Sequence, residues 1–454
     1  MDYEEFLKQK DFVLESSGFD IDKSALNPML YEFQKDIVRW ALAKGKAAIF
    51  SECGTGKTAM QLSWAHQVCR HTGGKVLILA PLSVADQTKR EAGKFHYEAK
   101  VCESQADCIN GINITNYEKM DKFVAKEFVG IVLDESSILK SYTGKVRNAL
   151  IQNFEHVPYK LACTATPAPN DHMELGNHAE FLGVMTRAEM LSMFFVHDGG
   201  QTSKWRLKGH ATEVFWQWMA SWSVFIDNPA SLGYDGSAYI LPELHINEVI
   251  VDGDVPTTES LTLTERRQAR KDSLDLRCQK ASDLVNESDE QWLVWCDLNA
   301  EGEMLESLIN ESKNVQGSDK NTYKSETMMN FSDEKLKCLI SKPQIAGYGM
   351  NWQNCHNMIF TGLSDSFEQY YQAIRRCWRF GQTREVNVCI IISAKEGCVK
   401  ENIERKQADF LTMRNAMIAL TKEITRKELR QTCRLTTPYN AETEMKLPNW
   451  KEFK

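Results

Sequence analysis

The fold of this chain is constrained most by a glycine-containing loop, Gly54-Thr55-Gly56-Lys57-Thr58, which follows the short apolar stretch at residues 47–50. Several backbone amides can point at one anion only where the loop lacks bulky side chains and a helix begins directly after it. Gly54 and Gly56 meet the first condition, and apolar residues at helical spacing from position 58 to position 68 meet the second. Lys57 then places a positive charge beside the outer phosphates of a nucleotide, and the Thr58 hydroxyl is suited to hold Mg²⁺. The pattern predicts a strand, a phosphate-binding loop and a helix, with ATP as the expected nucleotide.

Two adjacent carboxylates follow a second apolar run. Residues 128–133 form a continuous apolar stretch, as is typical of a buried parallel strand, and the run ends in Asp134-Glu135. We expect Asp134 to hold Mg²⁺ through water and Glu135 to orient and deprotonate an attacking water. The alternative is a solvated acidic pair at a strand end. That alternative provides no partner for the glycine loop.

A pair of arginines near the other end of the chain could complete such a site. Arg376 and Arg379 lie in a basic segment at residues 372–382. Because they are three positions apart, a helix would place both on one face, from which both could reach a γ-phosphate bound by a different lobe. This is the arrangement expected of arginine fingers, and a solvated basic helix face is the alternative.

Taken in chain order, these segments resemble those of the superfamily 2 helicases and translocases, from residue 30 to about residue 420. The ending Arg-x-x-Arg-x-Gly-Gln at residues 376–382 is similar to that of the Swi/Snf class, which translocates on double-stranded DNA. The Asp-Glu-Ser-Ser variant at residues 134–137 is similar to that of compact DEAD/DEAH-box-like helicases encoded by bacteriophages. The resemblance implies a DNA-dependent ATPase that uses ATP and Mg²⁺.

The resemblance also implies a set of binding residues. Gln34 looks like the residue that reads the adenine base, and residues 347–353 resemble a glycine motif of the second lobe. Residues 76–83 and 114–117 resemble motifs that grip a nucleic-acid strand. The implied nucleotide-binding residues are Gln34, Gly54, Thr55, Gly56, Lys57, Thr58 and Gly349. The implied nucleic-acid contacts are Pro81, Ser83, Thr115, Asn116 and Asn351.

Four positions depart from the family's pattern. Ser51 stands where the phosphate loop usually opens with glycine, and Ser137 stands where histidine is frequent. Arg375 and Trp378 replace an acidic residue and a histidine around the expected arginine fingers. These changes remove no expected catalytic group. They concern how ATP chemistry is coupled to the other motifs.

The alternation of apolar strands with helical stretches predicts an α/β fold with mainly parallel sheets and flanking helices. We expect two RecA-like lobes of the P-loop NTPase type, at residues 1–183 and 261–432, with ATP in the cleft between them. A small helical insertion is expected at residues 184–240, a linker at 241–260 and a C-terminal tail at 433–454. Opening and closing of the cleft would then be the motion that ATP drives.

Two further segments carry specific expectations. Aromatic residues recur at helical spacing at residues 215–225, which favours a helix packed on its own small core. Before them, Trp205 is flanked by cations in a loop-like context, where it could stack on a base; a solvated basic loop is the alternative. Apolar residues between positions 403 and 424 predict a helix packed across the second lobe.

Composition agrees with a large enzyme outside the membrane. The chain has 454 residues, 43% of them hydrophobic, and no apolar run approaches the ~18 residues that a membrane span requires. The N-terminus has no signal pattern and the 13 cysteines form no Cys-x-x-Cys pair, so we expect reduced thiols in a bacterial or infected-host cytoplasm. A net charge of −8 predicts salt-sensitive, moderate affinity for DNA through a few local contacts.

The sequence therefore predicts a DNA-dependent ATPase that moves on, or remodels, duplex or branched DNA. Two alternatives stay open. One is an RNA helicase of the same superfamily, against which the Arg-x-x-Arg-x-Gly-Gln ending argues. The other is an ATP-driven remodeller that displaces a DNA-bound protein client.

Overall fold

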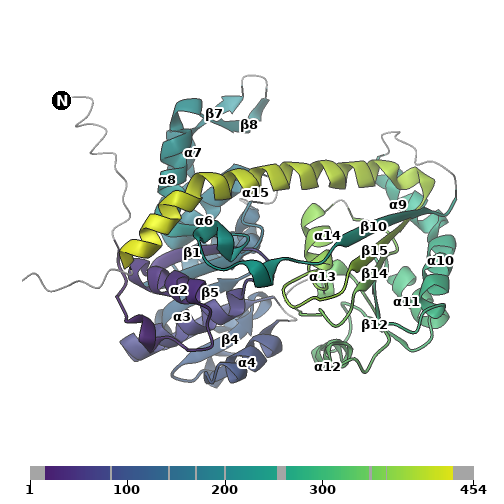
Figure 1. Cartoon of the computed structure of the whole chain (residues 1–454), viewed down its shortest axis with the longest axis horizontal. Helices are drawn as coiled ribbons and strands as arrows, with labels where there is room; N and C mark the ends of the chain where they lie inside the picture. The colour runs from purple at the N-terminus through teal and green to yellow at the C-terminus, as the bar shows by residue number, and fades with distance from the viewer. Residues whose placement is uncertain are drawn as a thin grey trace, which may run out of the picture.

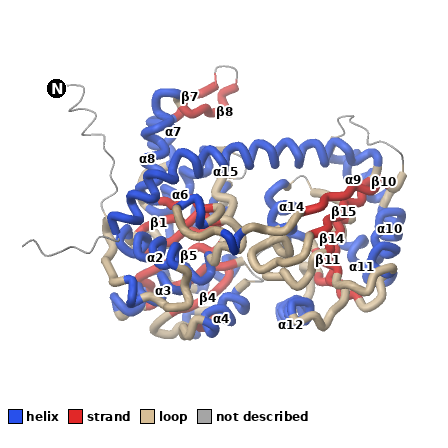
Figure 2. The backbone as a smooth tube through the Cα atoms, in the orientation of Figure 1, coloured by secondary structure: helices blue, strands red, loops and turns tan. Residues whose placement is uncertain are grey.

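The computed structural model describes residues 16–81, 84–141, 144–168, 171–198, 201–252, 262–346, 350–364 and 366–432. Two parallel sheets form the centres of two lobes, which lie side by side beneath one long helix, α15 (Gly397–Thr432) (Figure 1). Helices surround the strands of each lobe (Figure 2). The predicted fold class, two RecA-like lobes with mainly parallel sheets, is confirmed.

The sheet of lobe 1 has the strand order β3-β4-β2-β5-β6-β1-β9, and all its pairings are parallel. Its strands are β1 (Lys46–Ser51), β2 (Lys75–Ala80), β3 (Ala99–Val101), β4 (Ile112–Asn116), β5 (Phe128–Asp134), β6 (Tyr159–Thr164) and β9 (Ser223–Ile226). The helices of this part of the chain are α2 (Glu32–Lys44), α3 (Lys57–Thr72), α4 (Ala85–Lys94), α5 (Lys145–Asn153), α6 (Leu175–Leu182), α7 (Arg187–Phe194) and α8 (Thr212–Trp222).

The sheet of lobe 2 has the order β10-β15-β14-β11-β13-β12, again with parallel pairings. Its strands are β10 (Leu244–Ile250), β11 (Trp292–Trp295), β12 (Ser312–Val315), β13 (Cys338–Ser341), β14 (Asn357–Phe360) and β15 (Val386–Ile392). Its helices are α9 (Leu263–Asp272), α10 (Leu274–Asn286), α11 (Asn299–Leu308), α12 (Asn321–Ser332), α13 (Pro343–Ala346) and α14 (Phe367–Ile374).

Each lobe buries both faces of its sheet. In β1, Ala48 and Phe50 belong to one apolar cluster of lobe 1, whereas Ala47 and Ile49 belong to the cluster on the opposite face. Successive side chains of a strand point to opposite faces, so a strand covered on both sides must be apolar at every position. This is why the central strands are visible in the sequence as continuous apolar runs.

The expected insertion and linker both contain strands of the main sheets. Within residues 184–240, β9 pairs in parallel with β1, so this stretch belongs partly to lobe 1 itself. Within residues 241–260, β10 pairs in parallel with β15 and forms an edge of the lobe 2 sheet. The same insertion also carries an antiparallel hairpin, β7 (Phe195–Asp198) and β8 (Gln201–Leu207), which projects past α15 (Figure 1).

The long helix α15 joins the two lobes. Ile403 and Phe410 pack in a core cluster of lobe 2, whereas Met417 and Leu429 pack in the clusters of lobe 1. The second half of the helix lies against α8, α2 and β9. The predicted helix is present and packs on lobe 2 through its first half, but it continues onto lobe 1, which apolar spacing did not reveal. No helix within the described ranges is long and apolar enough to cross a membrane.

Candidate functional site

The predicted phosphate loop connects β1 to α3. Gly54 and Gly56 have φ angles of 90° and 87°, in the left-handed region that glycine adopts without strain. A Cβ on Gly56 would lie 2.2 Å from Nε2 of Gln34, and one on Gly54 would lie 2.8 Å from the backbone nitrogen of Phe380. Both positions therefore require glycine for conformation, and Gly54 requires it for space as well, because the atom that it would meet belongs to the backbone. Because α3 begins at Lys57, its N-terminal amides face the loop, which is where an anion is stabilised.

Lys57 and Thr55 bond within the loop itself. The Lys57 ammonium donates to the carbonyl oxygens of Ser51 at 2.7 Å and Glu52 at 3.2 Å. The Thr55 hydroxyl is buried and donates to the Glu52 carbonyl at 2.7 Å. Lys57 thus has its charge directed at backbone carbonyls that a phosphate oxygen can replace, whereas the side chain of Thr55 shapes the loop.

Asp134 ends β5 and is buried, with 8% of its surface exposed. Nε2 of Gln61, on α3, donates to its Oδ1 at 2.9 Å. Burial raises the pKa of the Asp134 carboxyl, while the Gln61 hydrogen bond and the charge of Lys57 act in the opposite direction. A divalent cation beside this carboxylate would favour its charged form. Because Mg²⁺ prefers oxygen ligands, Asp134 and the Thr58 hydroxyl, which line the same cavity, fit this ion.

Glu135 follows with a φ of 58°, an uncommon conformation for a residue with a side chain. Its Oε1 accepts hydrogen bonds from the hydroxyls of Thr164, at the end of β6, and Ser137, the latter at 3.1 Å. Burial raises the pKa of its carboxyl, and Lys57 and Thr164 partly oppose that rise. The side chain is therefore held by two hydroxyls beside a cation, as expected for a positioned general base.

Arg376 and Arg379 do not lie on a helix. The helix α14 ends at Ile374, and both arginines occupy the turn that follows. They nevertheless converge, because each donates to the carbonyl oxygen of Met350, Arg376 at 3.0 Å and Arg379 at 3.2 Å. Burial and the neighbouring charge of Arg376 lower the pKa of Arg379 to about 10. The predicted pairing is present, but a turn rather than a helix face produces it.

One cavity of about 320 Å³ collects these groups from both lobes. Lobe 1 contributes the glycine loop with Lys57 and Thr58, together with Asp134 and Glu135, and lobe 2 contributes the two arginines. The cavity therefore places an anion-binding loop, a candidate metal-holding carboxylate, a candidate base and two cations around one space. These are the groups that phosphoryl transfer from a nucleotide to water requires.

At one end of this cavity lies a cluster of aromatic rings. Tyr239 and Phe380 stack with ring centroids 4.6 Å apart, and Tyr31 meets Phe380 edge-on at 6.4 Å. Gln34, predicted to read adenine, donates to the Thr55 carbonyl and accepts from the Tyr31 amide, each at 2.9 Å. Gln34 thus connects the start of α2 to the phosphate loop, and it lines the cavity beside the rings.

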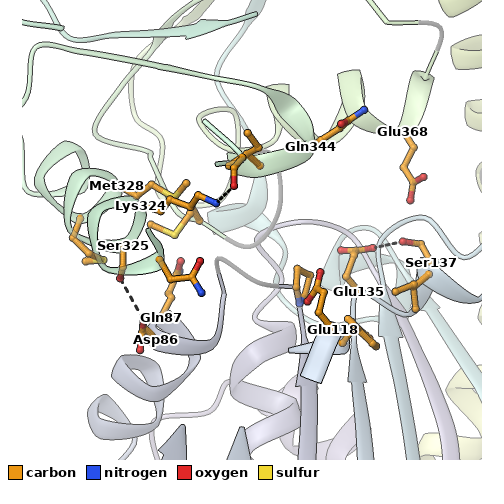
Figure 3. A pocket seen from close by; sticks show the side chains of 18 of the residues that line it. Asp86, Gln87, Glu118, Glu135, Ser137, Lys324, Ser325, Met328, Gln344 and Glu368 are labelled. Atoms are coloured by element: carbon orange, nitrogen blue, oxygen red, sulfur yellow. Dashed lines mark hydrogen bonds between the residues drawn. The ribbon is translucent and has the colours of Figure 1, made fainter. Parts of the chain in front are cut away.

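A second cavity, of about 490 Å³, lies between the lobes and is also lined by Glu135 (Figure 3). Glu135 and Ser137 line it from lobe 1, and Glu368 and Met328 line it from lobe 2. The lobes also meet at its rim, where Ser325 donates to Asp86 at 3.3 Å (Figure 3). Glu135 therefore borders both the nucleotide cavity and this interlobe cavity.

The predicted nucleic-acid contacts are dispersed. Pro81 lines both cavities, and Asn351 lines the nucleotide cavity beside the arginines. Thr115 is buried with its hydroxyl donating to the Cys102 carbonyl at 2.9 Å, and Asn116 is buried and caps the helix that follows by accepting from the Lys119 amide. Ser83 and Gly349 lie outside the described residues.

Trp205 lies on strand β8 rather than in a loop, so the loop-like context expected for it was wrong. Its ring lies 3.6 Å from that of His197 across the hairpin, and it packs against the core of lobe 1. It lines neither of the two cavities. A contact with nucleic acid at this residue stays a prediction.

Sequence reasoning missed the residues that hold the candidate catalytic carboxylates. Gln61 lies one helical turn after Lys57, and Thr164 is the hydroxyl at the end of β6, the strand next to β5 in the sheet. A search for donors at i+4 from the lysine and at the ends of neighbouring strands would have found both.

Comparisons with known proteins match two family models to this chain. Residues 20–169 match the model described as type III restriction enzyme, res subunit, and residues 277–381 match the helicase conserved C-terminal domain. The first match contains the phosphate loop and Asp134-Glu135, and the second contains the arginine turn. Among solved structures, the Sulfolobus solfataricus SWI2/SNF2 ATPase core in complex with dsDNA is 16% identical, with coverage of 91% of this chain and 98% of that chain and a TM-score of 0.42. No curated protein matches the chain.

Proposed function

We propose that this chain, which is an ATP-hydrolysing enzyme of helicase superfamily 2, uses ATP to translocate on, or remodel, duplex or branched DNA. The observation that carries the ATPase site is the single cavity in which the phosphate loop of lobe 1 faces Arg376 and Arg379 of lobe 2. Closure of the two lobes on ATP would complete that site, and hydrolysis would release it.

Each side chain of the cavity receives a role from its chemistry. Lys57 and the amides at the start of α3 bind the phosphates, and Thr58 with Asp134 holds Mg²⁺. Glu135 accepts a proton from the attacking water, and its two hydroxyl partners fix its direction. Mg²⁺ supplies charge neutralisation at the phosphates when it is bound.

Arg376 and Arg379 stabilise the charge that develops on the transferred phosphoryl group. Both donate to the Met350 carbonyl, and Arg376 also donates to the backbone and side-chain oxygens of Gln372. Each guanidinium has five N–H donors, so each keeps donors for a nucleotide without loss of these anchors. Replacement of Arg376 by Ala should lower kcat by about 10³-fold or more. A much smaller loss would assign the role to Arg379 alone.

DNA is proposed as the polymer on the basis of one motif. The ending Arg-x-x-Arg-x-Gly-Gln at residues 376–382 resembles that of the double-strand DNA translocases. The second cavity lies between the lobes and shares Glu135 with the nucleotide cavity, so any ligand bound there would lie beside the candidate base. The net charge of −8 predicts that binding depends on local contacts and weakens steeply with salt.

The test is steady-state ATP hydrolysis without polynucleotide and with single-stranded DNA, duplex DNA, a branched junction or RNA. We expect the strongest stimulation by duplex or junction DNA, and loss of all turnover in Lys57→Ala and in Glu135→Gln, the latter with ATP binding retained. Stimulation by RNA alone would indicate an RNA helicase. Indifference to every polynucleotide would indicate that a protein client is the missing partner.

A further inference from the structure

A buried carboxylate in the phosphate loop is held by α14 of the opposite lobe and by α15, the helix that joins the lobes. Glu52 follows Ser51 directly and is 8% exposed. Within the loop, its Oε1 accepts from the Cys53 amide at 2.7 Å. Its Oε2 accepts from the hydroxyl of Tyr371, on α14, and from the guanidinium of Arg414, on α15, at 2.8 Å.

A second arginine approaches the same group. Arg375, which directly follows α14, lies 3.4 Å from Oε1 of Glu52 and donates to the backbone carbonyl of Cys53 at 3.1 Å. Burial raises the pKa of the Glu52 carboxyl, but Arg375 and Arg414, together with the hydrogen bonds from Tyr371 and the Cys53 amide, lower it to about 2. The loop therefore carries a permanent negative charge. Among the described residues that contact this carboxylate, those that neutralise its charge lie outside lobe 1.

The backbone of Glu52 connects this cluster to the reacting end of the loop. Its carbonyl oxygen accepts from the Lys57 ammonium at 3.2 Å and from the Thr55 hydroxyl at 2.7 Å. The side chain of one residue is thus bound to α14 and α15, while its backbone is bound to the lysine that would contact the phosphates. A shift of either helix relative to lobe 1 moves the loop.

The arginine contacts are of a kind that can be released. A guanidinium binds a carboxylate most strongly through two parallel N–H donors. Arg414 contacts Glu52 through one terminal nitrogen, and so does Arg375. The Nε atoms of both arginines are buried without a hydrogen-bond partner among the described residues. Neither pair has the geometry of a fully satisfied structural ion pair.

We propose that Arg414 and Arg375 are positioning residues for ATP hydrolysis. Acting through Glu52, they hold the phosphate loop in register with Arg376, which follows Arg375 directly in lobe 2. The inference rests on the proposed function, because it assigns these residues to the ATPase site in the nucleotide cavity. The helix α15 is then the element through which the arrangement of the lobes affects the phosphate loop.

The test compares Arg414→Ala with Arg405→Ala. Arg405 lies on the same helix, is 64% exposed and pairs only locally, with Asp409 at 3.2 Å, so it controls for loss of an arginine from α15. Misplacement of a reacting group by about 1 Å can cost about 10²-fold in rate. We expect kcat to fall by about 10-fold to 10²-fold in Arg414→Ala. The affinity for a fluorescent ATP analogue should stay within about 3-fold, because the loop is part of lobe 1 and the bonds of Lys57 lie within it.

A purely structural role would give a different pattern. Arg414→Ala would then lower the melting temperature and leave kcat of the folded fraction equal to that of Arg405→Ala, which would overturn the proposal. Arg414→Lys keeps the charge and should recover part of kcat. If Arg414→Ala does not fold, the double variant Glu52→Gln, Arg414→Gln removes both charges together. A loss of kcat in that variant supports the proposal, and wild-type kcat contradicts it.

The same experiment separates this inference from the proposed function. Lys57→Ala should have no turnover in any background. If Lys57→Ala retains turnover, the assigned ATPase site is wrong and the positioning role is wrong with it. If Lys57→Ala is inactive while Arg414→Ala behaves like Arg405→Ala, the positioning role alone is wrong.

Discussion

The hydrogen bond from Gln61 to Asp134 gives a quantitative prediction about metal-dependent binding. Both side chains are buried, and the bond joins Nε2 of Gln61 to Oδ1 of Asp134 at 2.9 Å. Gln61→Leu keeps a similar volume and removes the donor. A hydrogen bond to a charged group contributes about 1.5–3 kcal/mol. Loss of an outer partner of a metal-holding group lowers metal affinity or activity by about 10-fold to 10²-fold. The two figures agree, since each tenfold change corresponds to about 1.4 kcal/mol.

The assay measures binding of a fluorescent ATP analogue with Mg²⁺ and with EDTA, followed by kcat/KM for MgATP. We expect Gln61→Leu to weaken binding or kcat/KM by about 10-fold to 10²-fold with Mg²⁺. In EDTA its binding should stay within about twofold of the wild type, because the altered contact serves the candidate metal-holding carboxylate and not the loop amides.

Gln67→Leu is the matched control. Gln67 lies on the same helix, is buried and donates to the Ala25 carbonyl at 2.8 Å, away from the cavity. Its replacement should affect stability but not the difference between Mg²⁺ and EDTA. Equal losses for Gln61→Leu in Mg²⁺ and EDTA would refute the reasoning, because they would indicate general damage to the loop.

Three further predictions follow from contacts around the same loop. Thr164→Val removes a hydroxyl donor whose bond lowers the pKa of Glu135, so the acid limb of the kcat profile should move to higher pH in a titration from pH 5 to pH 8. Gly54→Ala should abolish ATP hydrolysis, because its Cβ would lie 2.8 Å from the lobe 2 backbone. Gly73→Ala, which has open space around it and a φ of 71°, should lower the free energy of unfolding in urea by only about 1–2 kcal/mol. The folded pKa of Glu52 is lowered from its ordinary 4.5 to about 2, so its contribution of about 3 kcal/mol is complete above pH 4.5 and is lost as pH falls towards 2. The free energies of unfolding in urea of the wild type and Glu52→Gln should therefore converge as pH falls across that range. A difference that stays constant with pH would contradict the assignment.

The parts of the fold that the sequence predicted are those with a local signature. The strands β1 and β5 are covered on both faces, so each is an apolar run, and the loop after β1 carries glycines that its φ angles require. The pair Asp134-Glu135 lies at the end of such a strand, which made its position in the sheet predictable. The strands β1 and β5, the phosphate loop and the helix α3 were therefore visible without a structure.

The parts that were missed depend on contacts between distant segments. The strand β9 has only four residues and directly follows α8, so Phe225 continued the helical spacing of the aromatic residues before it. The edge strand β10 is only partly buried and has no apolar run. Arg414 meets Glu52 across 362 positions of the chain, and no local pattern indicates such a pairing. The arginine turn was misread because α14 ends two residues before Arg376, without glycine or proline to mark the end.

The helix α14 is where the contacts between the lobes converge. Near its start, Glu368 accepts from Thr166 at 3.4 Å and pairs with Lys140, and the Thr166 amide donates to the Thr164 hydroxyl, which holds Glu135. One turn later Tyr371 holds Glu52, the second anchor of the phosphate loop.

The end of the same helix leads directly into Arg375 and Arg376. One short rigid element therefore contacts the candidate base through two threonines, the phosphate loop through Glu52, and the space for the γ-phosphate through Arg376. Because these three connections share a helix, a small rotation of lobe 2 must change them together rather than one at a time. Replacement of Glu368 by Gln should consequently lower the stimulation of ATP hydrolysis by polynucleotide more than the unstimulated rate. An equal effect on both rates would restrict Glu368 to a structural role.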